Sequence, residues 1–175
     1  MERNIYNENW EAKLEQQFLK NNRCQKKAYI CSPLSADTSE GVLQNMKNAR
    51  AYMFYAAEQM NYAARAPHAY LPMLLCDSVP SDRALALQFG LHLLEESDAV
   101  LVCGSHISNG MQSEILHAVA LNMPIYAFDE SVYLEIRKLA THHGGDKSLI
   151  HLDRAHELLG WESPVIHLEN VREFR

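Results

Sequence analysis

The sequence lacks long apolar runs. None approaches the roughly 18 consecutive apolar residues that suggest a membrane-spanning helix. Its first twenty residues, MERNIYNENWEAKLEQQFLK, contain too many charged and amide side chains for a secretory signal peptide. We therefore expect a soluble protein of the cytoplasm that does not associate with membranes.

Cysteine is also sparse. The chain has four cysteines, with no CxxC pair and no cysteine–histidine spacing typical of zinc. Cys31 and Cys103 stand in apolar, strand-like runs, where a cysteine usually behaves as a small buried hydrophobe. Several of the nine histidines, among them His142 and His151, fall in polar or amphipathic stretches. We predict neither a metal site nor a cofactor.

An excess of positive charge is absent as well. The formal net charge is −6, which provides no general attraction to nucleic acids or anionic membranes. Tyr52, Phe54, Tyr55 and Tyr62 lie close together, but no basic stripe accompanies them, so binding of single-stranded nucleic acid has little support. Core packing or a subunit interface explains these aromatics better. With 175 residues, 47% of them hydrophobic, the chain is typical of one globular domain.

Short apolar runs alternate with amphipathic segments along residues 27–175. The apolar runs predict strands at 28–32, 63–66, 99–104, 124–128 and 165–168. The amphipathic segments predict helices at 37–60, 82–96, 109–122 and 131–141, and a weaker one around 152–159. We expect Asp37, Ser81 and Asn109 to begin the first three helices, and Leu85, Phe89 and Leu93 to share one side of the second.

This alternation predicts a parallel sheet with right-handed crossovers. We predict an α/β domain with a flavodoxin-like, doubly wound, five-stranded parallel sheet over residues 27–175. Residues 1–26 read as an N-terminal helical extension. Ligands of such sheets bind at the carboxyl ends of the strands, where the sequence places the loops 32–38, 67–72 and 105–110.

The third of these loops has the strongest indications of a binding site. Gly104 allows the backbone to turn sharply, and Gly110 allows a ligand to approach it closely. Ser108 and its polar neighbours stand beside the free N–H groups of a helix start, which suit a phosphate, a carboxylate or a sugar hydroxyl. Glu114 follows within the helix, either as a solvated residue or as a carboxylate directed at a ligand. We expect the helix start to keep Glu114 ionised.

Three motifs resemble a known family in their order and spacing. YICSPL, AVLVCG and S-x-G-M-x-x-E-I, spread over residues 28–128, resemble the nucleoside 2-deoxyribosyltransferase-like superfamily, closest to its short phage- and mobile-element-associated members. The resemblance implies that Glu114 attacks the anomeric carbon of a nucleoside or nucleotide and that Tyr29 orients it. It further implies that Ser108 binds the sugar or phosphate and that the protein is a homo-oligomer.

The resemblance fails at the acid that assists departure of the base. The family has an aspartate eight residues before the position of Asp98, where this chain has Gly90. His68 could replace it as a proton donor or base contact, although it could also only hydrogen-bond locally. Arg83 could hold a phosphate or simply face solvent, and Asp98 should anchor the entrance of its strand. The further candidate ligand contacts are Ser32, Pro33, Asn45, Gly104, Gly110 and Met111.

Three functions remain open. The first is hydrolysis or transfer at an N-glycosidic bond, because a carboxylate can stabilise an oxocarbenium-like centre and form a glycosyl ester. The second is a non-catalytic nucleotide-binding module, which the missing acid at Gly90 favours. The third is an NAD glycohydrolase of the TIR type, which would use a similar glutamate.

Overall fold

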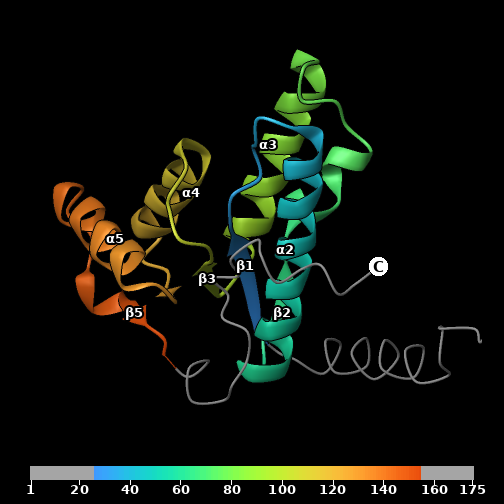
Figure 1. Cartoon of the computed structure of the whole chain (residues 1–175). Helices are drawn as coiled ribbons and strands as arrows, with labels where there is room; N and C mark the ends of the chain where they lie inside the picture. Colours follow the sequence, from blue (N-terminus) through green and yellow to red (C-terminus); the bar gives the residue numbers. More distant parts are fainter. Residues whose placement is uncertain (1–25, 155–175) are drawn as a thin grey trace, which may run out of the picture.

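The computed structural model describes residues 26–154, which form one parallel sheet with helices on both faces (Figure 1). The sheet has five strands in the order β2-β1-β3-β4-β5, and every neighbouring pair is parallel. The strands are β1 (Lys27–Cys31), β2 (Ala63–Arg65), β3 (Ala99–Val102), β4 (Ile125–Ala127) and β5 (Ile150–Leu152). The helices are α2 (Ser39–Gln59), α3 (Pro80–Glu95), α4 (Asn109–Ala120) and α5 (Glu130–His142), with 3₁₀ turns η1 (Pro67–Ala69), η2 (Leu71–Met73) and η3 (Lys147–Leu149). The predicted flavodoxin-like fold is confirmed, whereas the N-terminal extension lies outside the described residues apart from Lys26.

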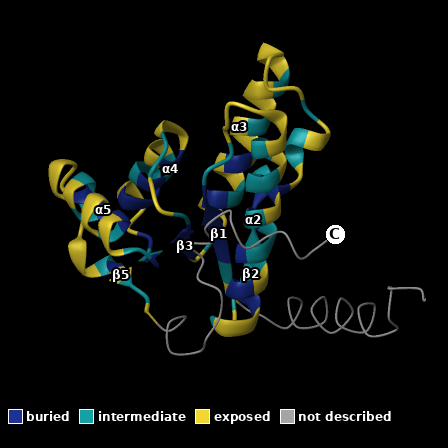
Figure 2. Cartoon of the chain, viewed as in Figure 1, coloured by how far each residue is buried: buried dark blue, intermediate teal, exposed yellow. Residues whose placement is uncertain are grey.

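The side chains of the central strands divide between two cores, because successive residues of a strand point to opposite faces. Tyr29, Cys31, Val100 and Val102 pack on one face with residues of α3, α4 and α5. Ala28, Ile30, Leu101 and Cys103 pack on the other face with α2. Tyr52 and Tyr55 of α2 belong to this second core, so core packing explains these two aromatics. The buried residues concentrate around β1 and β3 in Figure 2.

The helices begin one or two residues away from the predicted positions. Thr38, not Asp37, caps α2, because its side chain accepts a hydrogen bond from the Gly41 N–H at 3.1 Å. Ser108, not Asn109, caps α4. Helix α3 begins at Pro80 without any side-chain cap, so the prediction for Ser81 is wrong. Adjacent polar residues are equally suitable caps by type, and only the backbone geometry selects one of them.

The fifth strand comes from a different segment than predicted. It is Ile150–Leu152, which pairs with β4 through Ile125 and Ile150. A strand of three residues is too short to show a clear alternating pattern. The sequence therefore predicted Leu152 as the start of a helix. The predicted strand at 165–168 and most of the helix around 152–159 lie outside the described residues.

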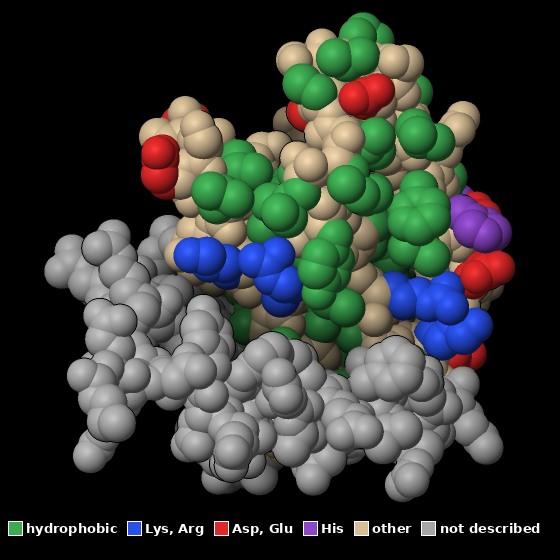
Figure 3. Space-filling view, turned by 90° about the vertical axis from the view of Figure 1, so that its right-hand side faces the viewer, with side chains coloured by type: hydrophobic (Ala, Val, Ile, Leu, Met, Phe, Trp, Pro, Cys, Tyr) green, Lys and Arg blue, Asp and Glu red, His purple; other side chains and the backbone are tan. Residues whose placement is uncertain are grey.

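Helix α3 leaves many apolar side chains exposed. Leu85 and Phe89, predicted to share one side of the helix, are both exposed, and only Gly90 and Leu94 of α3 are buried. The outer part of α3 is accordingly drawn largely as exposed in Figure 2. Figure 3 shows the side of the molecule that is on the right in Figure 1, next to α2 and β2. Hydrophobic side chains cover much of its upper half. None of the helices within residues 26–154 is long and apolar enough to span a membrane.

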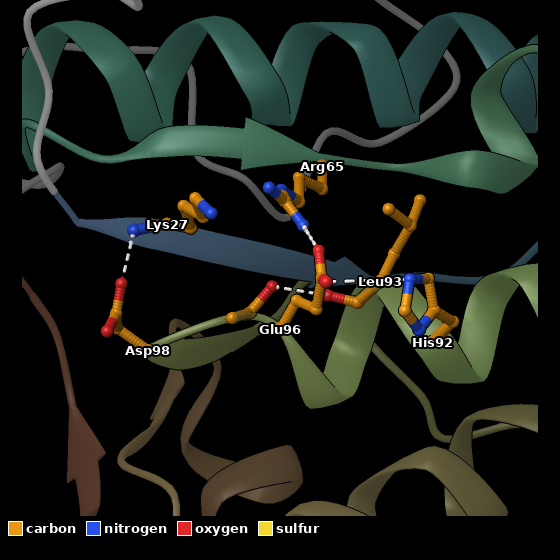
Figure 4. A network of polar contacts seen from close by, with 7 residues as sticks. Lys27, Arg65, His92, Leu93, Glu96 and Asp98 are labelled. Atoms are coloured by element: carbon orange, nitrogen blue, oxygen red, sulfur yellow. Dashed lines mark hydrogen bonds and ion pairs between the residues drawn. The ribbon is translucent and has the colours of Figure 1, made fainter.

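Asp98 ties the beginnings of two neighbouring strands together (Figure 4). Its carboxylate accepts a hydrogen bond from the Lys27 N–H at 2.7 Å, and its own N–H donates to the Lys27 carbonyl at 2.8 Å. Close by, Arg65 of β2 forms an ion pair of 3.2 Å with Glu96. Asp98 thus anchors the entrance of β3, as its position in the sequence predicted.

Candidate functional site

The three loops at the carboxyl ends of the strands are held together by two contacts. The hydroxyl of Ser32, after β1, lies 2.7 Å from Nε2 of His68 in η1. Gly104, after β3, has a φ of +102°, and a Cβ at this position would lie 3.1 Å from Cδ of Pro33. The sharp turn expected of Gly104 is therefore present, and the absence of a side chain lets the first and third loops pack together.

Glu114 is directed into the protein rather than into solvent. It lies on α4 facing β1, where its Oε1 accepts a hydrogen bond of 2.7 Å from the hydroxyl of Tyr29. The thiol of Cys31, two residues further along β1, neighbours both the Glu114 carboxylate and the Met111 carbonyl, whose oxygen is 3.8 Å from Sγ. With one proton, the thiol donates to one of these groups at a time. The carboxylate is thus held by two residues of β1, Tyr29 and Cys31, which point to the same face of the sheet.

Burial determines the protonation behaviour of this group. It raises the pKa of Glu114, although the hydrogen bonds from Tyr29 and Cys31 oppose the shift. The expectation that the helix start would keep Glu114 ionised is therefore incomplete, because desolvation outweighs the groups that favour the charge. Burial, and then the charge of Glu114, raises the pKa of Tyr29, so its hydroxyl stays protonated and remains a donor.

His68 is a neutral imidazole at neutral pH. Burial, which disfavours the charged ring, lowers its pKa to about 4. A neutral ring is a far weaker proton donor than an imidazolium. The position therefore suits a hydrogen-bonding contact to a ligand better than the acid that the sequence suggested. Which nitrogen carries the proton decides whether Ser32 donates to His68 or accepts from it.

Gly90 borders the site from α3. A Cβ at this position would lie 3.4 Å from the Tyr29 hydroxyl oxygen and 3.7 Å from Cγ of Pro67. The place where the resemblance expects an acid therefore does face the Tyr29–Glu114 pair. Pro67 directly precedes His68. Gly90 therefore lies close both to the Tyr29–Glu114 pair and to the loop that carries His68.

Three predicted ligand contacts at the loops have structural tasks. Asn45 donates from Nδ2 to the Leu34 carbonyl at 3.0 Å and so holds the loop after β1. Ser108 accepts a hydrogen bond from the Met111 N–H at 3.4 Å, which caps α4. Met111 itself is buried in the core. Asn45, Ser108 and Met111 thus support the loop and the helix that form the site.

Two other predicted contacts differ in their surroundings. Gly110 faces open space, since a Cβ there would meet no atom within 4 Å. Arg83 lies on the exposed part of α3, where it is 3.6 Å from the carboxylate of Asp77. The structure therefore does not bring Arg83 into contact with the Tyr29–Glu114 pair.

Sequence reasoning missed the role of Cys31. It appeared only as a buried hydrophobe, yet it stands two residues after Tyr29, and this spacing places both side chains on the same face of a strand. That period was the available signal. No comparable signal marked Pro67, because its proximity to Gly90 depends on how η1 and α3 pack.

Comparison with known families places the chain. Residues 26–128 match a family model described as a domain of unknown function, DUF7768, over more than half of the sequence. The chain belongs to the DUF7768 family. Its matched part contains strands β1 to β4 and every site residue discussed above. No curated protein matches the chain.

Proposed function

We propose that this DUF7768 protein cleaves the N-glycosidic bond of a nucleoside or nucleotide, with Glu114 as the nucleophile. One observation carries the proposal: the 2.7 Å hydrogen bond between the Tyr29 hydroxyl and the Glu114 carboxylate, on the helix that follows the loop at the carboxyl end of β3, where ligands of this fold bind. The motifs that resemble the nucleoside 2-deoxyribosyltransferase-like superfamily support the same assignment.

In the proposed reaction, a carboxylate oxygen of Glu114 bonds to the anomeric carbon. The bond from that carbon to the base nitrogen breaks, and the base leaves with the bonding electron pair and takes up a proton from solvent water. Water or a second base then attacks the anomeric carbon of the glycosyl ester and gives up a proton to solvent, and the electron pair of the ester bond returns to the carboxylate. Tyr29 keeps the carboxylate in one orientation through both steps.

The raised pKa of Glu114 fits a nucleophile that is partly desolvated. A carboxylate that is removed from water is solvated less strongly, so it loses less solvation free energy when it forms a bond to the anomeric carbon. The same shift requires that Glu114 lose its proton first, so activity should increase as the pH rises through its pKa.

A panel of nucleosides, nucleoside 5′-monophosphates and NAD, followed by chromatography of released base, tests the proposal. We expect release from at least one nucleoside or nucleotide, and its loss in Glu114→Gln. Glu135→Gln is the matched control, because Glu135 is an exposed glutamate on α5. Release that persists in Glu114→Gln contradicts the proposal. Release from NAD alone supports the NAD glycohydrolase instead.

Gly90 favours a second candidate, a binding module without catalysis. The position beside the Tyr29 hydroxyl has no side chain that could protonate a leaving base. A module of this kind would be stabilised against heat by one member of the panel, with no base released from any of them. Loss of that stabilisation in Glu114→Gln, but not in Glu135→Gln, would locate the ligand at the same site.

We further propose that the protein acts in the cytoplasm on a small molecule, without nucleic acid or membrane partners, and as a homo-oligomer. The support for the first part is the net charge of −6 and the lack of a basic stripe. The resemblance to the nucleoside 2-deoxyribosyltransferase-like superfamily supports the homo-oligomer.

A further inference from the structure

The thiol of Cys31 lies at the contact between β1 and α4, where solvent does not reach it. Its side chain is 0% exposed, and its Sγ is 3.8 Å from the Met111 carbonyl oxygen. Met111 and Glu114 are three residues apart on α4, so both lie on the side of the helix that faces β1. One sulfur atom therefore stands beside a backbone carbonyl and beside the Glu114 carboxylate.

The two acceptors beside this thiol differ in charge and in their other donors. A carbonyl within an α-helix accepts from the N–H four residues further on, so the Met111 carbonyl keeps a donor without the thiol. Within residues 26–154, the Glu114 carboxylate has only one donor besides Cys31, the Tyr29 hydroxyl. An ionised carboxylate is the stronger acceptor, because a hydrogen bond to a charged group is roughly twice as strong as a neutral one. A protonated Glu114 loses that advantage over the carbonyl.

We infer that Cys31 is a positioning residue for Glu114, and that the thiol proton follows the charge of the carboxylate. While Glu114 is protonated, the thiol donates to the Met111 carbonyl. Once Glu114 is ionised, the thiol donates to the carboxylate. This change needs only a rotation about the Cβ–Sγ bond, with the sulfur in place. The inference rests on the proposed function only for the claim that the ionised carboxylate, held by Tyr29 and Cys31, is the form that attacks.

Both donors to Glu114 remain protonated because they are buried on the same face of β1. Burial, and then the charge of Glu114, raises the pKa of the Cys31 thiol and that of the Tyr29 hydroxyl. Helix α3 presents Gly90 and Leu94 to this core, and neither of them titrates. Water cannot replace the thiol as a donor, because the sulfur is enclosed.

The other ionisable groups of these helices and strands have partners of their own. His117 of α4 pairs with Glu95 of α3 at 3.0 Å, and both are partly exposed. The second buried thiol of the sheet, Cys103, packs on the opposite face with α2, and its Sγ is 3.7 Å from the Leu101 carbonyl oxygen. Cys103 therefore provides a matched control, a buried thiol beside a carbonyl but away from the Glu114 carboxylate.

Infrared spectroscopy of the full chain tests the inference without any ligand, since the S–H stretching band moves to lower frequency as the thiol forms a stronger hydrogen bond. We expect the Cys31 band, identified by its loss in Cys31→Ala, to move to lower frequency as the pH rises through the pKa of Glu114. The band should not move in Glu114→Gln. In Cys103→Ala the moving band should remain.

The side-chain carboxyl carbon of Glu114, labelled with ¹³C and identified by its loss in Glu114→Gln, reports the ionisation directly by NMR. Cys31→Ala should raise the pKa of Glu114, and Cys31→Ser should return it toward the wild-type value, because a hydroxyl also donates. Cys103→Ala should leave it unchanged. The acidic limb of base release should move with the pKa of Glu114, with little change in KM, since Cys31 acts through Glu114.

Three outcomes overturn the inference: a Cys31 band that stays in place while Glu114 ionises, an unchanged pKa of Glu114 in Cys31→Ala, and an equal rise in Cys31→Ala and Cys31→Ser. The third would assign the effect to the volume of the sulfur rather than to its proton. If Cys31→Ala does not fold, the infrared comparison of the wild type with Glu114→Gln decides. Absence of base release contradicts the proposed function alone, because the infrared and NMR titrations observe the protein without substrate.

Discussion

The hydroxyl of Tyr29 and the carboxylate of Glu114 form a hydrogen bond of 2.7 Å across 85 positions of the chain. Tyr29 stands in the middle of a central strand, and Glu114 stands in the second turn of the helix that packs over it. A half-buried carboxylate that is held by a protonated phenol has one defined orientation and an altered affinity for protons. Both properties can be measured.

Tyr29→Phe removes the hydrogen bond without changing the packing of the ring. Loss of one such bond should destabilise the protein by about 1 kcal/mol. The pKa of Glu114 should rise further, because the bond from Tyr29 favours the charged form. If base release is observed, the acidic limb of its pH profile should therefore move to higher pH. Tyr133→Phe on α5 should leave the profile in place, and an unchanged profile in Tyr29→Phe would contradict the assigned contact.

Glu114→Gln should make the protein more stable at neutral pH. The folded-state pKa of Glu114 is raised, so its favourable contribution is present below its unfolded pKa and is lost as the pH rises through the folded value. Replacing a residue that is unfavourable at pH 7 typically contributes about 1 kcal/mol. Urea unfolding at pH 7 and near pH 4.5 measures the difference from the wild type, which should shrink at the lower pH. A less stable Glu114→Gln at pH 7 would show that the carboxylate stabilises the fold.

His68 should make the fold sensitive to acid. Its pKa is about 4 in the folded chain and about 6.5 in the unfolded one, so the unfolded state takes up the proton first. The stability is fully present above about pH 6.5 and is lost as the pH falls through about 4, by at most about 3 kcal/mol. His68→Gln should flatten the pH dependence of unfolding over this window. The exposed His106→Gln should not, and equal slopes in both variants would refute the prediction.

Two glycines that frame the third loop should respond in opposite ways to alanine. Gly104→Ala combines a φ of +102° with a Cβ 3.1 Å from Pro33, and should destabilise the protein by about 1–3 kcal/mol. Gly110→Ala places a methyl group in open space within α4 and should be neutral or stabilising by up to about 1 kcal/mol. Thermal unfolding of the two variants distinguishes these effects. Equal losses in both would mean that Gly110 also has a packing role.

Much of the fold could be predicted, because burial imposes a period on the sequence. The run that became β3 is apolar throughout and that of β1 is apolar after Lys27, since both faces of a parallel sheet are covered. The helices α2 and α3 between them and the parallel pairing of the strands follow from the alternation of apolar runs with amphipathic segments. The fifth strand could not be placed, because three residues carry too little pattern. Helix α2 is capped by Thr38 and not by Asp37. Both residue types can cap a helix, and the position of the backbone turn selects Thr38.

The candidate site, too, could be predicted only in part. The alternation of strands and helices in the sequence was enough to place Gly104 and the loop before Glu114 at the carboxyl edge of the sheet, and the resemblance implied that Tyr29 contacts Glu114. Only the tertiary structure decided that Glu114 is desolvated, that His68 is neutral, and that Gly90 borders the Tyr29 hydroxyl. Desolvation and close contact depend on atoms from segments far apart in the chain. No local pattern contains that information.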